Sequence, residues 1–201
     1  MRGLILDYGG VLTMPHEMGP MAARLGVPVE AFARAYMVDR EALDTGVLPV
    51  DEYWDRFLSH LSVAHLASPS LIASLVEDDV ASWSKLREET WTIAATFRAS
   101  AGRTALLTNN IPPLMARLRA SGRLAAHFDV VIASCEFGAC KPAPTIFRAC
   151  LEALGVDAKD TLFVDDHPPN VAGAAVLGMK TLLFENDASV ERLRQLLELP
   201  A

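Results

Sequence analysis

The sequence predicts an α/β protein with a Rossmann-like parallel sheet core and an inserted α-helical cap domain. Three observations support this fold class. Short apolar runs alternate with helical patterns, most of these runs end in polar residues, and one long helical block separates the first run from the second. Strands that alternate with helices form parallel sheets through right-handed crossovers. Buried strands of such sheets are continuously apolar because helices cover both faces.

The first strand is predicted at residues 4–6, which run directly into Asp7. This carboxylate should emerge at the C-terminal edge of the strand, where open α/β sheets bind their ligands. Gly9 and Gly10 follow, and glycine permits a sharp turn that brings backbone N–H groups close to an anion. An Asp at this point can also cap a turn with its own side chain. The functional interpretation of Asp7 therefore depends on whether other apolar strands in the chain also end in polar residues.

The next segment, up to about residue 99, is almost entirely helical, with apolar residues at helical spacing. The predicted helices are Met21–Leu25, Pro28–Val38, Val50–Leu61, Pro69–Val80 and Ser84–Arg98. No strand pattern interrupts them. We expect a core domain of residues 1–14 and 100–201 and a helical cap of residues 15–99, which could roof the end of the first strand.

After residue 100 the alternation of strands and helices begins. The remaining strands are predicted at Thr104–Leu107, Phe128–Ala133, Thr161–Val164 and Met179–Phe184. The helices between and after them are predicted at Pro112–Ala120, Pro144–Leu154, Asn170–Leu177 and Ala188–Leu199. Proline in the first turn marks the start of two of these helices, and Gly178 is a C-cap signal.

Composition narrows the class of protein. Apolar residues make up 51% of the 201 residues, which excludes a disordered chain. The net charge of −7 and the lack of a Lys/Arg cluster argue against nucleic-acid binding. No apolar run has the length of a membrane span or a signal peptide, so a soluble cytoplasmic protein is expected. The three cysteines match no zinc pattern and are expected to be free thiols.

Polar residues follow three of the predicted strands and one loop: Asp7, Thr108-Asn109, Lys141 and Asp165-Asp166. The carboxyl ends of parallel strands lie at one edge of a sheet, so these groups should meet there. Clustered carboxylates repel one another unless a cation neutralises them, and Mg²⁺ suits carboxylates together with substrate oxygens. Each residue also has a structural interpretation, as a turn residue, a surface lysine or an acidic helix start. Together they favour nucleophilic catalysis by a carboxylate.

Within this set, Asp7 would attack phosphorus. Lys141 would hold a phosphate or neutralise the nucleophile, and the Thr108 hydroxyl would stabilise the equatorial oxygens. The amide of Asn109 and the backbone N–H of Gly10 are expected beside the same substrate group.

These motifs, in this order and spacing, resemble the haloacid dehalogenase-like hydrolase superfamily. The resemblance covers the whole chain, because residues 15–99 are similar to the small helical cap that follows the first strand in that superfamily. Residues 39–57 resemble the cap helices of a subfamily with many small-metabolite phosphatases. The resemblance implies a Mg²⁺-dependent phosphatase of a small phosphorylated metabolite. It implies Asp7 as the nucleophile and Thr108 with Lys141 as the phosphate-holding pair.

The resemblance also implies a metal site. Asp7, Asp165 and Asp166 match its acidic residues, and Gly9 matches a position whose backbone carbonyl binds Mg²⁺. Asn170 matches a residue that supports the last of these loops. The main departure is at Gly9, where most phosphatases of the superfamily have a second Asp that protonates the leaving alkoxide and deprotonates water.

This departure predicts slow turnover of alkyl phosphates unless another group replaces the missing acid, and His16 or His167 could do so. Two alternatives remain open. One is a 2-haloacid dehalogenase, which lacks the second Asp, although an acidic pair beside the nucleophile would hinder it. The other is a phosphate-binding regulatory module without turnover. Substrate choice would depend on cap residues such as Tyr36, Arg40 and an aromatic pair, Tyr53-Trp54, or these could simply form the cap's core.

Overall fold

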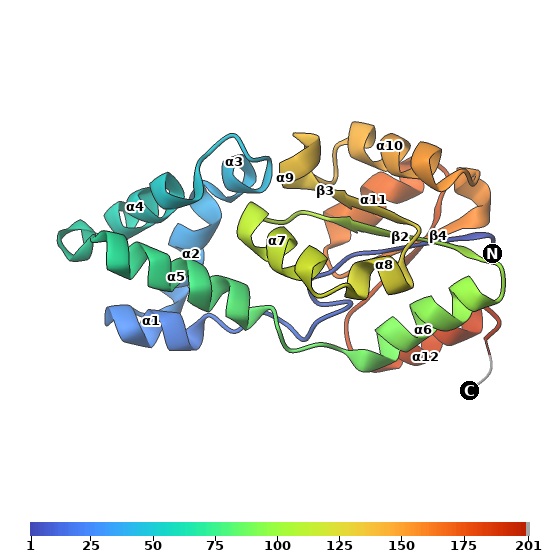
Figure 1. Ribbon diagram of the computed structural model, residues 1–201, viewed down its shortest axis with the longest axis horizontal. Coiled ribbons are helices and arrows are strands. Elements are labelled where there is room, and N and C mark those ends of the chain that lie inside the picture. Colours follow the sequence, from blue (N-terminus) through green and yellow to red (C-terminus); the bar gives the residue numbers. More distant parts are fainter. Residues whose placement is uncertain (200–201) are drawn as a thin grey trace.

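The computed structural model describes residues 1–199 and has a five-stranded parallel sheet at its centre (Figure 1). The strands lie in the order β3-β2-β1-β4-β5, so β1 occupies the middle. Their bounds are β1 (Gly3–Leu6), β2 (Arg103–Thr108), β3 (Val130–Ala133), β4 (Thr161–Asp165) and β5 (Lys180–Leu183). The predicted parallel α/β sheet is therefore confirmed.

Helices cover both faces of the sheet, as the apolar strands require. The Ile5 face packs against helices α10 (Pro144–Leu154) and α11 (Pro168–Val176). Leu4 and Leu6 point to the opposite face, where a second apolar cluster forms. The helices on that side are α6 (Glu88–Ala99), α7 (Pro112–Ala120), α8 (Arg123–His127) and α12 (Ala188–Leu196). Since successive strand residues point to opposite faces, β1 contributes to two separate cores.

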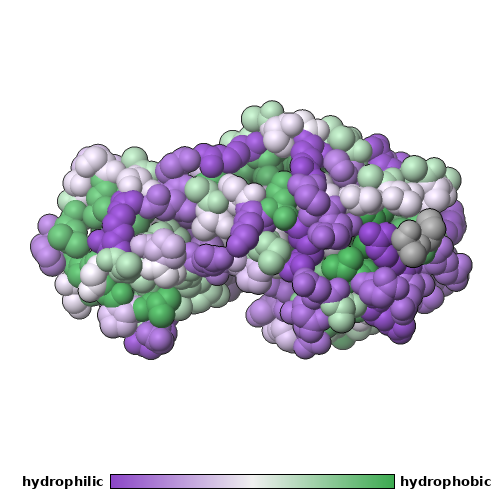
Figure 2. Space-filling model, turned by 90° about the horizontal axis from the view of Figure 1, so that it is seen from below, coloured by the Kyte–Doolittle hydropathy of each residue, from purple (hydrophilic) through white to green (hydrophobic). Residues whose placement is uncertain are grey.

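A second lobe consists of helices alone (Figure 1). Its elements are α1 (Gly19–Leu25), α2 (Val29–Val38), α3 (Arg40–Asp44), α4 (Val50–His60), a 3₁₀ turn η1 (Ala64–Leu66) and α5 (Pro69–Ser82). Helix α4 buries Tyr53, Trp54 and Phe57 along one face, and the Phe57 ring lies 4.8 Å from that of Phe32 in α2. The aromatic pair Tyr53-Trp54 therefore packs into the cap's own core. Figure 2 shows this lobe and the sheet lobe with a notch between them.

Helix α6 lies inside the range predicted for the cap but packs on the sheet lobe. It contacts β2, α8 and α12, and the Trp91 indole N–H donates to the Leu12 carbonyl at 2.9 Å. Helical periodicity identifies a buried face without saying which element covers it. We propose that the cap ends with α5, near Trp83, instead of at residue 99.

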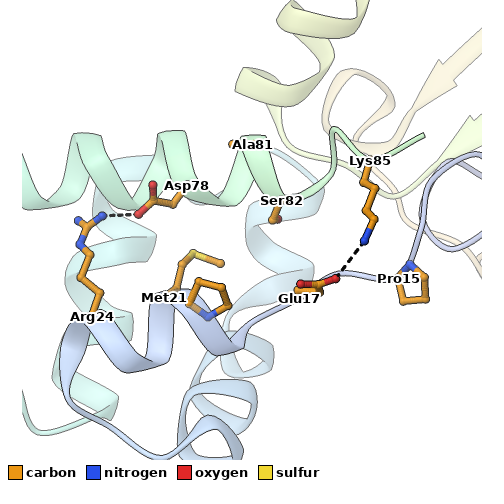
Figure 3. Close-up of a pocket in the computed structure, with 9 residues that line it drawn as sticks. Pro15, Glu17, Met21, Arg24, Asp78, Ala81, Ser82 and Lys85 are labelled. Carbon is orange, nitrogen blue, oxygen red and sulfur yellow. Dashed lines mark hydrogen bonds and ion pairs between the residues drawn. The ribbon is translucent and has the colours of Figure 1, made fainter. Parts of the chain in front are cut away.

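Two chain segments connect the lobes and run side by side. Thr13 and Leu86 form an isolated antiparallel bridge, and the Met14 N–H donates to the Lys85 carbonyl at 2.7 Å. The Lys85 ammonium also lies 3.5 Å from the Glu17 carboxylate on the first connection (Figure 3). This pairing fixes the direction in which the cap leaves β1.

A groove of about 500 Å³ lies beside these connections, between α1 and α5 (Figure 3). An ion pair between Arg24 and Asp78 crosses it, and Met21 and Ser82 contribute to its walls. None of the residues predicted to bind substrate or metal lines this groove. The hollow is therefore separate from the polar edge of the sheet.

Short elements account for most of the other differences from prediction. Helix α8 and helix α9 (Ser134–Phe137) fall in segments for which no helix was predicted, as does a 3₁₀ turn, η2 (Ala158–Asp160). One turn of helix carries too few residues to show a periodic pattern. Within residues 1–199, no helix combines the length and apolar composition needed to cross a bilayer.

Candidate active site

The polar residues predicted at strand ends meet because of the strand order. Leu6 of β1 pairs with Leu106 of β2 on one side and Val164 of β4 on the other. The Asp7 N–H continues this pairing and donates to the Val164 carbonyl at 3.0 Å. Asp7 and Asp165 therefore leave neighbouring strands at the same level, at the C-terminal edge of the sheet.

Lys141 lies between these two carboxylates and is buried. Its ammonium is 2.8 Å from Asp7 Oδ1 and 2.6 Å from Asp165 Oδ2. Burial alone would lower the pKa of Lys141, but the charges of Asp7 and Asp165 and their hydrogen bonds raise it above its usual value. The side chain therefore remains a cation at neutral pH, as predicted for a group that neutralises the nucleophile.

Asn109 positions this lysine. Its side-chain amide donates to the Lys141 carbonyl at 2.9 Å, and its side-chain oxygen accepts from the Lys141 N–H at 2.8 Å. The position of Asn109 after a strand predicts that its amide binds substrate, whereas these contacts direct it to the main chain of Lys141. We therefore propose that Asn109 is a positioning residue. Thr108, at the end of β2, is buried beside it.

The Asp165 carboxylate is fully buried and accepts hydrogen bonds from several donors. Besides Lys141, it accepts from the His167 N–H at 2.8 Å and from the amide of Asn170, which lies 3.1 Å from both carboxylate oxygens. Asn170 belongs to the first turn of α11 and ties this helix to the end of β4. The contact agrees with the supporting role that the resemblance implied for Asn170.

A third carboxylate, Asp166, lies close to the two that Lys141 contacts. One oxygen from each of Asp7, Asp165 and Asp166 lies within 4.8 Å of the other two. Burial raises the pKa of Asp7 to about 7; Lys141 opposes this increase, and the charges of Asp165 and Asp166 add to it. Burial and the Asp165 charge also raise the pKa of Asp166. A set of hard oxygen donors with surplus negative charge fits Mg²⁺.

Different structural constraints favour glycine at the two positions that follow Asp7. Gly10 has a positive φ of 67°, and a Cβ placed on it would lie 2.2 Å from Asp166 Oδ2, so a side chain there would displace that carboxylate. The Gly10 N–H is 3.3 Å from the hydroxyl oxygen of Thr13, its acceptor. At Gly9, a Cβ would lie 3.1 Å from Cζ3 of Trp83.

A second polar cluster lies in the cap and was not predicted as a unit. Arg40 of α3 and Tyr36 of α2 were suggested individually, but Asp44, Asp79 and His16 complete the group. The Arg40 guanidinium donates to Asp44 at 2.9 Å and lies 3.8 Å from Asp79. These residues come from three helices and a connection. Tyr36, Arg40 and Asp44 follow one another at intervals of four residues, but no such spacing links them to Asp79 or His16.

This cap cluster is joined to the sheet lobe. The Ser134 hydroxyl, at the start of α9, donates to the Asp44 carbonyl at 2.5 Å and accepts from the Asn110 N–H at 2.9 Å. Burial raises the pKa of the Asp44 carboxyl, while Arg40 and, to a smaller extent, the charge of Lys141 oppose this increase. Asp44 therefore lies close enough to the strand ends to experience the field of Lys141.

Fold and site together define a hydrolase class in which a strand-end Asp faces a lysine and an acidic pair. Residues 1–178 match the family model described as haloacid dehalogenase-like hydrolase, and the chain belongs to that family. The confirmed family membership agrees with the resemblance seen in the motifs.

Known proteins that resemble this chain include phosphatases. A phosphoserine phosphatase of Thermus thermophilus is 39% identical over 79 residues, which are 39% of this chain and 32% of that protein. Acyl-CoA dehydrogenase family member 10 of mouse is 36% identical over 110 residues, 52% of this chain and 10% of the mouse protein. The chain thus spans well under half the length of these curated relatives.

Among solved structures, a haloacid dehalogenase family enzyme of Bacteroides thetaiotaomicron in complex with magnesium and inorganic phosphate aligns with a TM-score of 0.70. The alignment covers 90% of this chain and 93% of that one at 21% identity. At this level of identity the comparison establishes the shared fold.

Proposed function

We propose that the protein is a Mg²⁺-dependent phosphatase that hydrolyses a small phosphorylated metabolite through an aspartyl-phosphate on Asp7. The observation that carries the proposal is the pairing of Asp7 and Asp165 with one buried ammonium at the sheet edge, with the Asp166 carboxylate close to both of these acids. The names of the phosphatase relatives and the magnesium and phosphate in the Bacteroides enzyme support this substrate class.

In this mechanism an oxygen of Asp7 attacks phosphorus and the bond to the leaving oxygen breaks. Lys141 and Thr108 stabilise the charge on the equatorial oxygens, while the ion pairs of Lys141 hold its ammonium beside the nucleophile. Water then attacks the aspartyl-phosphate, which releases inorganic phosphate and restores Asp7. The contact between Asn109 and the Lys141 backbone keeps the lysine in place throughout.

The metal would be held by Asp7, Asp165 and Asp166 together with the backbone carbonyl of Gly9. When bound, Mg²⁺ supplies the positive charge that reduces repulsion between a carboxylate nucleophile and a phosphate dianion. The crowding of the three carboxylates is the structural reason to expect it, since a single lysine leaves them under-neutralised.

The same crowding separates this proposal from a 2-haloacid dehalogenase. Halide displacement by Asp7 would require no cation, and the buried Asp165 together with Asp166 would then place uncompensated charge beside the reacting carbon. Phosphate release is therefore the favoured reaction. A regulatory module that binds phosphate without turnover would share the same geometry, and only kinetics distinguishes it.

The test measures release of inorganic phosphate from a panel of phosphorylated metabolites, with Mg²⁺ or with EDTA. We expect Mg²⁺-dependent release that is lost in Asp7→Asn, a variant of equal size that retains the fold. Release of halide from 2-haloacids in EDTA would show the dehalogenase reaction instead. Phosphate binding by the wild type without product in a single-turnover experiment would identify the regulatory module.

A further inference from the structure

His16 lies in the first connection between the lobes and has an unusual environment. Its side chain is 6% exposed, and neither ring nitrogen has a hydrogen-bond partner within residues 1–199. Buried polar atoms nearly always have such a partner, because leaving one unpaired costs free energy. The imidazole therefore has donor and acceptor capacity that no other group within residues 1–199 uses.

Trp83 connects this imidazole to the missing acid–base position. The rings of His16 and Trp83 stack with centroids 4.6 Å apart and planes at 12°. The same indole fills the space beside Gly9, where a Cβ would lie 3.1 Å from Cζ3. The Tyr8 hydroxyl donates to the Trp83 carbonyl at 3.0 Å, which fixes the tryptophan against the loop that follows Asp7. His16 and position 9 thus contact the same ring.

The cap cluster borders His16 on the other side. The Nε2 atom of His16 is 3.6 Å from Asp79 Oδ1, a fully buried carboxylate that also accepts a hydrogen bond from the Tyr36 hydroxyl at 2.8 Å. Arg40 lies 3.8 Å from the other oxygen of Asp79. Asp79 therefore faces Nε2 at the distance of an ion pair, and Nδ1 has no hydrogen-bond partner among residues 1–199.

Resting on the proposed phosphatase function, we propose that His16 performs the proton transfers that an aspartate at position 9 would otherwise provide. As Asp7 attacks phosphorus, the bond to the leaving oxygen breaks and the protonated imidazole gives its proton to that oxygen, releasing an alcohol. The neutral imidazole then takes a proton from the water that attacks the aspartyl-phosphate. Phosphate leaves and His16 is protonated again, so the cycle balances.

Two charged groups lie beside His16 and act on its imidazole in opposite directions. Burial lowers the pKa of His16, Asp79 opposes that decrease and Arg40 adds to it. His167, the other histidine considered, is exposed to solvent. Its backbone N–H donates to Asp165.

The test compares His16→Gln with the wild type on two esters, an alkyl phosphate and p-nitrophenyl phosphate. Nitrophenolate leaves without protonation, whereas an alkoxide does not. We expect kcat/KM for the alkyl ester to fall about 10²-fold and kcat/KM for the nitrophenyl ester to remain nearly constant. With the nitrophenyl ester, the variant should release one nitrophenolate per enzyme in a burst before slow turnover, because the water-activating base is missing.

The control variant is His65→Gln, an exposed cap histidine, which should match the wild type on both esters. In His16→Gln, an unchanged ratio of the two kcat/KM values would overturn the proposal. If both values fell equally, the loss would indicate a structural role. A changed ratio in His167→Gln alone would assign the role to that residue. Absence of phosphate release from the wild type would overturn the proposed function itself, so the two failures are distinguishable.

A measurement on the wild type does not depend on whether the variant folds. The ¹⁵N shifts of the His16 ring should respond when inorganic phosphate is added in the presence of Mg²⁺, because a phosphate oxygen would then lie near Nδ1. Shifts that remain constant while phosphate binds would contradict the proposal.

Discussion

The two lobes each contain one buried basic residue between two carboxylates, and the comparison shows what a catalytic cluster requires. Lys141 lies 2.8 and 2.6 Å from Asp7 and Asp165, while Arg40 lies 2.9 and 3.8 Å from Asp44 and Asp79. The surroundings differ more than these distances do.

In the sheet lobe a third carboxylate, Asp166, lies close to the two acids that Lys141 contacts, so the group holds three acids and one cation. In the cap the Tyr36 hydroxyl donates to Asp79 and the two acids are shared by one guanidinium. The first cluster is short of positive charge, while the second is close to balanced. We therefore assign metal and chemistry to the Lys141 cluster and the alignment of cap and His16 to the Arg40 cluster.

Replacing a carboxylate in each cluster should produce the largest difference between them, in the rate of phosphate release. Asp7→Asn should reduce phosphate release by at least about 10⁴-fold, since removing a nucleophile removes the covalent step. Asp44→Asn, a carboxylate change in the cap cluster, should retain measurable turnover. Initial rates with Mg²⁺ present test both, and comparable losses in the two variants would contradict the assignment of chemistry to the sheet edge.

Asp7→Asn has a second consequence, for stability. The pKa of Asp7 is about 7 in the folded protein and 3.8 as its ordinary value, so between these values the folded state binds more protons than the unfolded state. The free energy of unfolding of the metal-free wild type should therefore fall as pH rises from about 4 to 7. This part of the slope should be missing in Asp7→Asn, as urea denaturation in EDTA at several pH values can show.

The next effect concerns the two buried cations. Lys141→Met and Arg40→Met each leave a pair of carboxylates without their partner, and each should lower the free energy of unfolding by about 3–5 kcal/mol. Mg²⁺ should restore much of the loss in Lys141→Met because it can neutralise Asp7 and Asp165. It should restore little in Arg40→Met. Urea denaturation with Mg²⁺ and with EDTA measures the difference, and equal rescue of both variants would contradict the comparison.

Metal binding by itself should have a smaller effect. At a Mg²⁺ concentration about 100 times Kd, the wild type should gain about 2.7 kcal/mol of stability. Asp166→Asn should reduce that gain because Asp166 belongs to the carboxylate trio, and Asp78→Asn, at an exposed cap position, should leave it unchanged. Thermal unfolding across a Mg²⁺ titration provides the measurement. A full gain in Asp166→Asn would remove this residue from the proposed metal site.

The smallest effect concerns position 9. Gly9→Asp should lower the free energy of unfolding by about 1–3 kcal/mol, because the new Cβ would crowd Trp83. In the background of Trp83→Ala the same substitution should cost less, and a double-mutant cycle measures this coupling. Additive costs would show that Trp83 does not occupy the space of the missing side chain.

Some features of the protein follow from short stretches of sequence. The apolar run of residues 4–6 that ends in Asp7 identifies a buried strand and its functional end, because strand, turn and carboxylate are neighbours in the chain. The same holds for Thr108, the last residue of β2, and for Asp165 and Asp166 at the end of β4. Helix α7 was predicted with its observed bounds, since a proline in its first turn and the apolar spacing agree.

Other features depend on contacts between distant segments. Residues 88–99 are a helix by their periodicity, but only packing shows that α6 covers the sheet rather than the cap. Asn109 looked like a substrate ligand because it follows a strand, whereas its amide binds the main chain of Lys141, 32 residues away. No local pattern specifies such a partner.

The sequence alone determined the parallel α/β core, the helical insertion and the set of strand-end residues, because hydrophobic period and chain direction are local properties. The tertiary structure decided which residues share charge and space. It placed His16 on Trp83, Trp83 against Gly9, and Arg40 between two acids contributed by different helices. Burial and distance set the strength of electrostatic interactions, and both arise only when segments far apart in the chain pack together.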